Sequence, residues 1–338
     1  MVEIAGMSLI VTDKCNASCR HCGFSAGPEK NSVIPLASAR KYLEELRKQK
    51  SALLVSYTGG EPFLYYEHLK EIISSAASLG FYGEVVTNSF WADDIGKTYK
   101  ILKELRTIGV INFVTSLDDF HAEFIEPEYV KNAVLAASEL GYNVTVKITG
   151  PSGEGAEHRC NKSGCADVRY TYDYVQGFLA AREKKIKVIS QYPVTSGRAA
   201  TQAHPAAQAH PVAQGHKANV RGRCTTVIRF PSVNPAGEVY PCCGFGEKNR
   251  LLGNAQTTSL DEIFTDMQNN LFLNLLSGVG PLKLLDSVRA YLQKPPRENF
   301  GNICEVCNYI IEDADVNRAV GRLLAKWAGT KAQAGAEA

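Results

Sequence analysis

Apolar and polar positions in the first 200 residues follow two alternating patterns. Short apolar runs with the length of buried strands cover residues 7–11, 52–57, 84–87, 112–116, 143–148 and 187–190. Between them, segments with helical periodicity cover residues 35–50, 66–79, 93–108, 127–140 and 171–184. Gly80, Gly109 and Gly141 each follow one of these segments, where glycine can cap a helix. Six βα units in a row predict an α/β fold, with a parallel sheet and helices outside it.

The pattern changes after residue 219. A β-hairpin is predicted over residues 234–243, with Ala236 and Gly237 at its turn. Helical periodicity returns over residues 260–276, 282–292 and 312–327. From Gly329 onward the composition predicts a disordered tail.

A short repeat separates these two parts of the chain. Residues 203–214 read Ala-His-Pro-Ala-Ala-Gln and then Ala-His-Pro-Val-Ala-Gln, and a third, degraded copy follows. Its three histidines, His204, His210 and His216, are six residues apart and could bind a metal. The Ala, Pro and Gln content favours a flexible linker instead.

Composition narrows the possible partners. The chain has 338 residues, of which 45% are apolar, and its formal net charge is +2. This near-balance of charge gives no reason to expect nucleic acid or an anionic membrane surface as a partner. No run approaches the roughly 18 apolar residues of a transmembrane helix, and no signal peptide is recognisable. We therefore expect a cytoplasmic protein, in which clustered cysteines bind metal more often than they form disulfides.

Three cysteines lie close together near the N-terminus. Cys15, Cys19 and Cys22 have the spacing C-x3-C-x2-C. Zinc loops usually offer two cysteines at a time and close with four protein ligands. Three thiolates from one loop instead suit a four-iron cluster in which one iron stays open to another ligand.

A second motif follows the apolar run 52–57. Gly59, Gly60 and Glu61 come directly after this predicted strand. Glycines at a strand end allow the backbone to approach a ligand closely, and a glutamate there can accept a hydrogen bond from an ammonium group. By itself the motif could be an ordinary strand-to-helix turn.

Together the two motifs resemble the radical S-adenosylmethionine (radical SAM) family. The resemblance implies a partial (β/α)6 TIM barrel over residues 1–200 and assigns Cys15, Cys19 and Cys22 to a [4Fe-4S] cluster. It assigns Gly59, Gly60 and Glu61 to S-adenosylmethionine, with contact to the methionyl amino group. It also implies an external one-electron reductant of flavodoxin or ferredoxin type. Asn88, Ser116 and Asp118 fall at predicted strand ends, where such barrels bind ligands, so they are expected to line the cofactor or substrate pocket.

A second group of cysteines lies in residues 220–311. Its members are Cys224, Cys242, Cys304 and Cys307, which could close a second metal site. A structural zinc site is the main alternative, because Cys304 and Cys307 form a C-x2-C pair. The segment resembles the shortened SPASM or twitch domains of radical SAM enzymes, and the resemblance implies one auxiliary [4Fe-4S] cluster. The expected domains are then the barrel, a linker at 201–219, the cluster domain at 220–311, and a C-terminal helix with its tail at 312–338.

Cys243 directly follows one of these predicted ligands. Neighbouring residues on a strand point to opposite sides, so Cys243 could face the barrel while Cys242 binds the cluster. A buried apolar cysteine is the plain alternative. Several segments around it and elsewhere resemble the radical SAM peptidyl epimerase of the epipeptide pathway; they are 12–19, 87–91, 116–121, 192–193, 239–243 and 303–307. The resemblance implies that Cys243 returns a hydrogen atom to a peptide α-carbon and so converts an L-residue to a D-residue.

The chain also departs from that epimerase. The family has an acidic residue four positions after the first auxiliary cysteine, where this chain has Ile228. Cys160 and Cys165 are additional and could form a redox pair, bind metal, or lie in a plain solvent loop. Peptide crosslinking, sugar or aminoglycoside epimerisation, and a non-enzymatic metal-cluster protein therefore remain alternatives.

Overall fold

In the computed structural model, six parallel strands come from the described residues before 192. The structure describes residues 2–149, 186–191, 197–198, 220–242, 251–292, 295–298, 300 and 302–336. Within them, the parallel strands lie in the order β6-β5-β4-β3-β2-β1. Their bounds are β1 Gly6–Thr12, β2 Leu54–Gly59, β3 Tyr82–Thr87, β4 Val110–Ser116, β5 Asn143–Thr149 and β6 Ile186–Gln191. The predicted partial barrel is confirmed, and the carboxyl ends of the strands meet at one edge.

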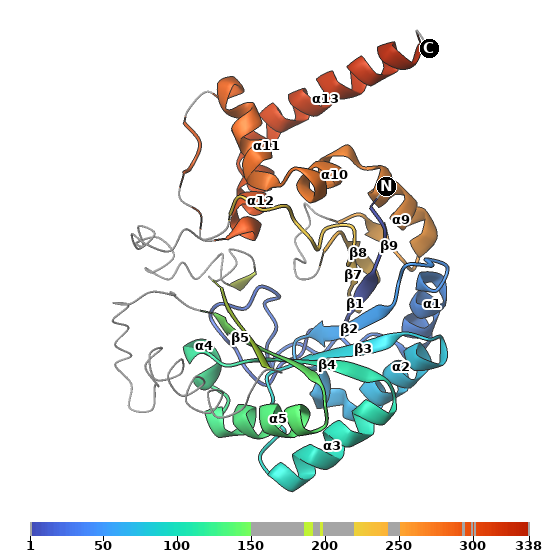
Figure 1. The fold of residues 1–338 in the computed structure, drawn as a ribbon, viewed down its shortest axis with the longest axis vertical. Helices are drawn as coiled ribbons and strands as arrows, with labels where there is room; N and C mark the ends of the chain where they lie inside the picture. Colours follow the sequence, from blue (N-terminus) through green and yellow to red (C-terminus); the bar gives the residue numbers. More distant parts are fainter. Residues whose placement is uncertain are drawn as a thin grey trace.

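Helices cover the outside of this sheet (Figure 1). They are α1 Leu36–Leu46, α2 Tyr66–Ser78, α3 Ile95–Thr107 and α5 Pro127–Glu139, with a short 3₁₀ turn at Pro62–Tyr65 and a short α4 at Asp119–Ala122. Gly80, Gly109 and Gly141 follow α2, α3 and α5 with φ of +84°, +100° and +78°, which confirms them as helix caps. All seven residues of β1 are buried, as expected for a strand packed on both faces.

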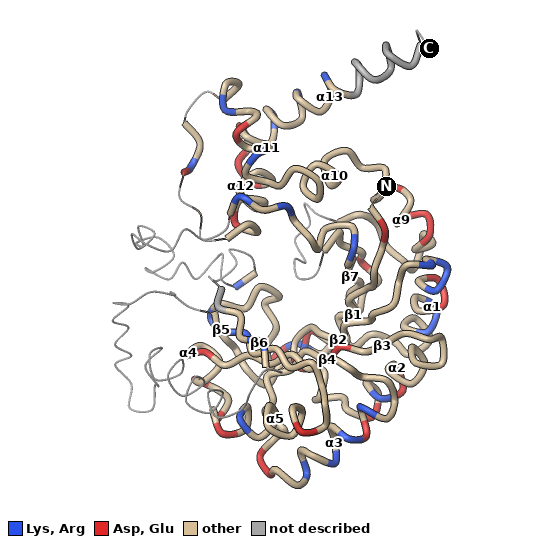
Figure 2. Tube along the Cα trace, in the orientation of Figure 1, with Lys and Arg blue, Asp and Glu red and all other residues tan. Residues whose placement is uncertain are grey.

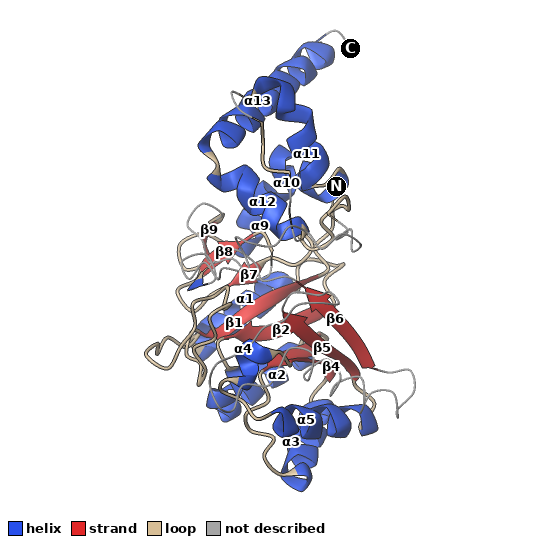
Figure 3. Cartoon of the chain, turned by 90° about the vertical axis from the view of Figure 1, so that its left-hand side faces the viewer, coloured by secondary structure: helices blue, strands red, loops and turns tan. Residues whose placement is uncertain are grey.

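The C-terminal part of the chain extends the same sheet. The hairpin is formed by β7 Ser232–Val233 and β8 Glu238–Tyr240, which are antiparallel, and β8 also pairs with β9 Gly253–Asn254. Because β7 pairs in parallel with β1, barrel and hairpin share one nine-stranded sheet. The remaining helices gather at one end, with α13 projecting away (Figure 3); they are α9 Leu260–Asn269, α10 Leu271–Gly278, α11 Pro281–Val288 with a 3₁₀ turn at Arg289–Tyr291, α12 Ile303–Glu312 and α13 Ala314–Ala336.

Two expectations for this region are corrected. The helix expected over residues 260–276 is broken at Asn270, whose backbone is extended (φ −70°, ψ 113°) and whose side chain caps α10 by accepting from Leu273 N. The tail expected from Gly329 is instead helical as far as Ala336. Alanine, the strongest helix former, recurs through this segment and outweighs Gly329 and Gly335. The predicted helix at 171–184 and the linker at 201–219 lie outside the described residues.

Charges of both signs are interspersed along the outer helices (Figure 2). Arg40 of α1 pairs with Glu71 of α2 at 3.9 Å, and Lys70 of α2 pairs with Glu104 of α3 at 2.7 Å. Among the described residues no single helix is long and apolar enough to cross a membrane. One pair bent by 114°, Leu271–Gly278 with Pro281–Tyr291, reaches that length and hydropathy together.

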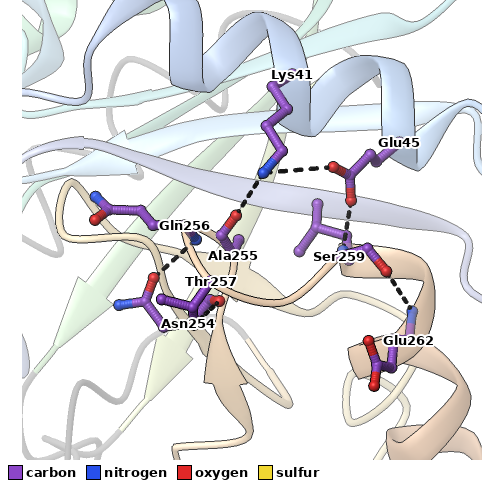
Figure 4. A network of polar contacts seen from close by, with 9 residues as sticks. Lys41, Glu45, Asn254, Ala255, Gln256, Thr257, Ser259 and Glu262 are labelled. Atoms are coloured by element: carbon purple, nitrogen blue, oxygen red, sulfur yellow. Dashed lines mark hydrogen bonds and ion pairs between the residues drawn. The ribbon is translucent and has the colours of Figure 1, made fainter.

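A polar network joins α1 of the barrel to the start of α9 (Figure 4). Lys41 Nζ donates to the carbonyl of Ala255 at 3.0 Å and lies 3.8 Å from the Glu45 carboxylate. Glu45 Oε2 in turn accepts the backbone N–H of Leu260, the first residue of α9. Glu45 thus satisfies one of the unpaired N–H groups at this helix end, where negative charge is also favourable.

Glu45→Ala is expected to destabilise the protein by about 1–2 kcal/mol, because it leaves the Leu260 N–H without its acceptor and removes the charge at the α9 N-terminus. Urea denaturation would measure the change in the free energy of unfolding. Glu44→Ala is the matched control, since Glu44 is an exposed residue on the same helix. Equal stability of the two variants would contradict the role assigned to Glu45.

Candidate active site

The three N-terminal cysteines lie on one loop between β1 and α1. This cysteine loop, residues 13–35, is closed on itself by hydrogen bonds from Cys15 N to Gly27 O at 3.1 Å and from Ser32 N to Asp13 Oδ1 at 2.9 Å. Cys22 N donates to Cys19 O at 3.1 Å, so these two cysteines are joined by a tight turn. Cys19 is buried, and Cys15 and Cys22 are partly exposed; none of the three is in a disulfide.

The Cys15 thiol is partly buried and lies next to the side-chain amide of Asn88. Asn88 Nδ2 lies 3.8 Å from Cys15 Sγ and also donates to Asn16 Oδ1 at 2.9 Å. Burial raises the pKa of the Cys15 thiol to about 11. The thiol therefore keeps its proton at neutral pH until a metal displaces it, as ligation requires a thiolate. Three thiols on one loop, one buried and two partly buried, with an amide donor at one sulfur fit an iron–sulfur cluster.

The glycine pair after β2 touches the start of this loop. Gly60 N donates to Thr12 O at 2.7 Å, and Glu61 N donates to Lys14 O at 2.8 Å. A Cβ added at Gly60 would lie 2.0 Å from Lys14 O, so no larger residue fits there. Gly59 has φ +131°, a conformation that L side chains rarely adopt. Because these glycines lack a side chain, the backbone after β2 can lie close enough to form hydrogen bonds with the start of the cysteine loop.

Glu61 is fully buried and lies at the centre of a hydrogen-bond network. Its Oε1 accepts from Phe63 N at 3.0 Å and from Thr87 Oγ1 at 2.9 Å, and its Oε2 accepts from Asn88 N at 2.7 Å. Burial raises the pKa of Glu61 to about 7 in spite of these donors. Oε2 keeps a lone pair that could accept from a cationic amine. The carboxylate also joins the end of β2 to the end of β3.

Asp118 follows β4 and is buried beside two histidines. Its Oδ1 accepts from His121 Nδ1 at 2.8 Å, and its Oδ2 accepts from Thr149 N at 3.1 Å. Burial alone would raise the pKa of Asp118, but the His121 contact holds it below its usual value. His21, Asp118 and His121 place ligand-type atoms within 4.8 Å of one another.

Several contributing residues were not assigned from the sequence. The Nδ1 of His21 is buried without a hydrogen-bond partner among the described residues, and burial lowers its pKa to about 4. Its place between Cys19 and Cys22 was the available signal. His121 is three residues after Asp118, a helical spacing that could have suggested their contact. Arg198, whose backbone N–H donates to Cys22 O at 3.0 Å, gave no sequence signal.

Ser116 and Asn88 occupy strand ends as predicted. Ser116 is the last residue of β4 and is partly exposed, and Asn88 directly follows β3 and is buried. The structure therefore brings the cysteine loop, the Gly-Gly-Glu turn and these two residues to one edge of the sheet.

The second group of cysteines comes from three segments. Cys224 Sγ accepts from Val227 N at 3.4 Å, and Cys242 lies two residues beyond β8. Cys304 and Cys307 are in the first two turns of α12, where a separation of three residues puts them on one face. All four are partly buried, a setting that fits thiolate ligands of a metal. The iron and zinc alternatives share this donor set.

Ile228, at the position of the family's acid, has an unusual backbone. Its φ is +70° and its side chain is fully buried. A β-branched residue rarely adopts this conformation, so the backbone is strained. Its N–H donates to Pro241 O at 2.9 Å, close to Cys242. An apolar residue with a strained backbone therefore lies close to Cys242.

Other predicted features lie outside the described residues. They are Cys243, Cys160, Cys165, the segment 192–193 and the histidines of the repeat, His204, His210 and His216.

Gly60→Ala is expected to prevent assembly of the N-terminal cluster, because the new Cβ would displace the backbone of Lys14 and with it the cysteine loop. Iron analysis of the reconstituted protein should then show about four fewer iron atoms per chain, the content of one cubane cluster. Gly278→Ala is the control, since nothing lies within 4 Å of a Cβ at that position. Full iron content in Gly60→Ala would mean that the loop tolerates the shift.

Family models match both parts of this arrangement. Residues 9–161 match the model of the radical SAM superfamily, and residues 224–308 match the SPASM iron–sulfur cluster-binding domain. The chain belongs to the radical SAM superfamily. It is a radical SAM enzyme with a C-terminal SPASM domain, so the expected [4Fe-4S] cluster and S-adenosylmethionine fit the cysteine loop and the Gly-Gly-Glu turn.

Individual relatives agree with this assignment. The chain is 23% identical over 316 residues to YydG of Bacillus subtilis, a protein named for peptide biosynthesis, with 91% of this chain and 92% of YydG covered. It is similar in fold to anSMEcpe with bound AdoMet, with TM-score 0.54 and 15% identity over 96% of this chain and 99% of that one. A second anSMEcpe structure, with AdoMet and the Cp18Cys peptide, gives TM-score 0.53 and 15% identity over 93% and 94%.

Proposed function

We propose that this radical SAM enzyme epimerises residues of a ribosomally made peptide from L to D. The observation that carries the proposal is the cysteine pair Cys242-Cys243, in which a second thiol directly follows a candidate ligand of the auxiliary cluster. Similarity to YydG over 91% of the chain supports a peptide substrate, and so does the peptide complex of anSMEcpe, a structure of similar fold.

The chain's own groups have distinct roles in this proposal. Cys15, Cys19 and Cys22 hold the cleaving cluster, and Cys224, Cys242, Cys304 and Cys307 hold an auxiliary [4Fe-4S] cluster. Glu61 and the glycines before it would orient S-adenosylmethionine, and Oε2 of Glu61 has a lone pair that would be available to its ammonium group. When bound, cluster and cofactor supply a 5′-deoxyadenosyl radical. Asn88, Ser116 and Asp118 line the pocket in which the substrate is held.

In the proposal, one hydrogen atom leaves one face of the substrate's α-carbon and another is added to the opposite face. The bound cluster and cofactor would supply the group that takes the α-hydrogen from one face, and that hydrogen would leave in 5′-deoxyadenosine. Cys243 Sγ then gives a hydrogen atom to the opposite face, which completes the inversion. The sulfur radical left on Cys243 returns to the thiol by taking one electron and one proton. An external reductant of flavodoxin or ferredoxin type supplies the electron, and we place the reaction in the cytoplasm.

Anaerobic turnover in deuterated water tests this proposal. The candidate peptide would be analysed by mass spectrometry while 5′-deoxyadenosine is followed in parallel. Because the thiol proton exchanges with solvent, epimerisation through Cys243 should add one deuterium to each inverted residue. Chiral amino-acid analysis of the hydrolysed peptide should then find the deuterium in the D-residue.

Other outcomes would overturn the proposal in distinguishable ways. A peptide product that has lost hydrogen would indicate thioether or carbon–carbon crosslinking on the same scaffold. Reaction with a sugar or aminoglycoside, and none with the peptide, would reassign the substrate. Absence of 5′-deoxyadenosine from fully iron-loaded protein under every condition would leave only a metal-binding role.

A further inference from the structure

The chain beyond β6 returns to the cysteine loop. β6 is an edge strand of the sheet and ends at Gln191. Farther along, Arg198 N donates to Cys22 O at 3.0 Å. At Gly197, φ is +57° and an added Cβ would lie 2.4 Å from Gly23 O. Gly197 and Arg198 therefore lie directly against the backbone that follows the third cysteine.

The side chain of Arg198 contacts the same loop. Its guanidinium donates to the carbonyl of Ala26, four residues after Cys22. The residue is partly buried, and its guanidinium is a cation with a planar set of hydrogen-bond donors. Two hydrogen bonds, one from the backbone and one from the side chain, thus fix this cation on the C-terminal half of the cysteine loop.

Two acidic side chains lie beside the same loop. Glu61 is fully buried, and its backbone N–H donates to Lys14 O of the cysteine loop at 2.8 Å. Asp118 is also buried, and its carboxylate lies within 4.8 Å of a ring nitrogen of His21, which stands between Cys19 and Cys22. Two buried carboxylates therefore disfavour additional negative charge in this pocket, and Arg198 is a cation that offsets them.

We propose that Arg198 is a positioning residue whose charge favours the reduced state of the N-terminal cluster. Reduction adds one electron from the external donor and no proton, so the cluster with its thiolates becomes one unit more negative. A fixed positive charge in a poorly solvated pocket stabilises the more negative state. Net charge near the sulfurs is among the factors that set the potential of such clusters.

A redox titration of the reconstituted holoenzyme, monitored by electron paramagnetic resonance, tests this inference. It needs neither peptide nor S-adenosylmethionine, so its result is independent of the epimerase proposal. Arg198→Gln keeps a hydrogen-bond donor but removes the charge. At a fixed potential we expect about a tenfold lower ratio of reduced to oxidised N-terminal cluster in this variant. For a one-electron couple, this ratio corresponds to a midpoint potential lower by about 59 mV. Arg198→Lys, which keeps the charge, should stay near the wild type.

Two internal controls accompany the titration. The auxiliary cluster should keep its potential in both variants. Arg47→Gln removes an equal charge from the exposed end of α1 and should change neither cluster. An unchanged N-terminal potential in fully iron-loaded Arg198→Gln would overturn the inference. If that variant does not load iron, normal loading of Arg198→Lys would support a need for the charge, and failure of both would refute it.

Discussion

Cys243→Ala is expected to uncouple the two halves of the reaction. Formation of 5′-deoxyadenosine should continue, because the residues that hold the cluster and cofactor are unchanged. The yield of inverted, deuterium-labelled residue should fall by about a hundredfold or more, since this variant removes a group that acts only after hydrogen abstraction. Liquid chromatography with mass spectrometry would measure both products from one anaerobic reaction.

Cys243→Ser sharpens the same experiment. Serine matches cysteine in shape, but its O–H bond is too strong to give a hydrogen atom readily to a carbon radical. It should therefore behave like Cys243→Ala. Cys165→Ala removes a thiol elsewhere and should leave inversion intact. Full inversion by Cys243→Ala would mean that another group donates the hydrogen atom.

Glu61→Gln is expected to have the second largest effect, on cofactor binding. The backbone N–H of Phe63 and the hydroxyl of Thr87 both donate to Oε1, so the amide oxygen should occupy that position. The amide NH₂ then faces Asn88 N and the site proposed for the methionyl ammonium group, where it repels both. Loss of one charge-assisted hydrogen bond predicts S-adenosylmethionine binding weaker by about 10- to 100-fold. Isothermal titration of the iron-loaded protein would measure it, with Glu44→Gln as the exposed control.

Glu61 also predicts a pH dependence of stability. Its pKa of about 7 in the folded protein lies above the ordinary value of 4.5, so the fold favours the protonated form. This group's contribution to the free energy of unfolding should therefore decrease as the pH rises from about 4.5 to about 7 and stay constant above that. Urea denaturation across this range should show the slope in the wild type and a smaller slope in Glu61→Gln. The pKa of Asp118 is lowered from its ordinary 3.8, so this residue adds a separate loss of stability only as the pH falls below that value. Equal slopes in the two proteins would contradict the assignment.

Local sequence patterns were enough to predict the barrel and its metal loop. Each strand is a short apolar run, and each helix carries its own periodicity and, in three cases, its capping glycine. The spacing of Cys15, Cys19 and Cys22 likewise lies within one loop. The break at Asn270 was missed because apolar residues continue on both sides of it, and the extended backbone of this one residue is set by its capping contact with Leu273.

Contacts between distant segments needed the tertiary structure. The pairing of β7 with β1, which joins the cluster domain to the barrel sheet, involves only two residues of each strand. The Glu61 carboxylate looked from sequence like a ligand for an amine, and the structure shows that it also ties Thr87 and Asn88 to the end of β2.

The sequence by itself determined the order of the elements, the cysteine spacing and the Gly-Gly-Glu turn, because periodicity and motif spacing are local properties of the chain. Only the tertiary structure placed Asp118 against Thr149 and Arg198 against Cys22. Those placements depend on how parallel strands bring their carboxyl ends to one edge, and on where the chain returns after β6. Neither is encoded in the residues immediately around each contact.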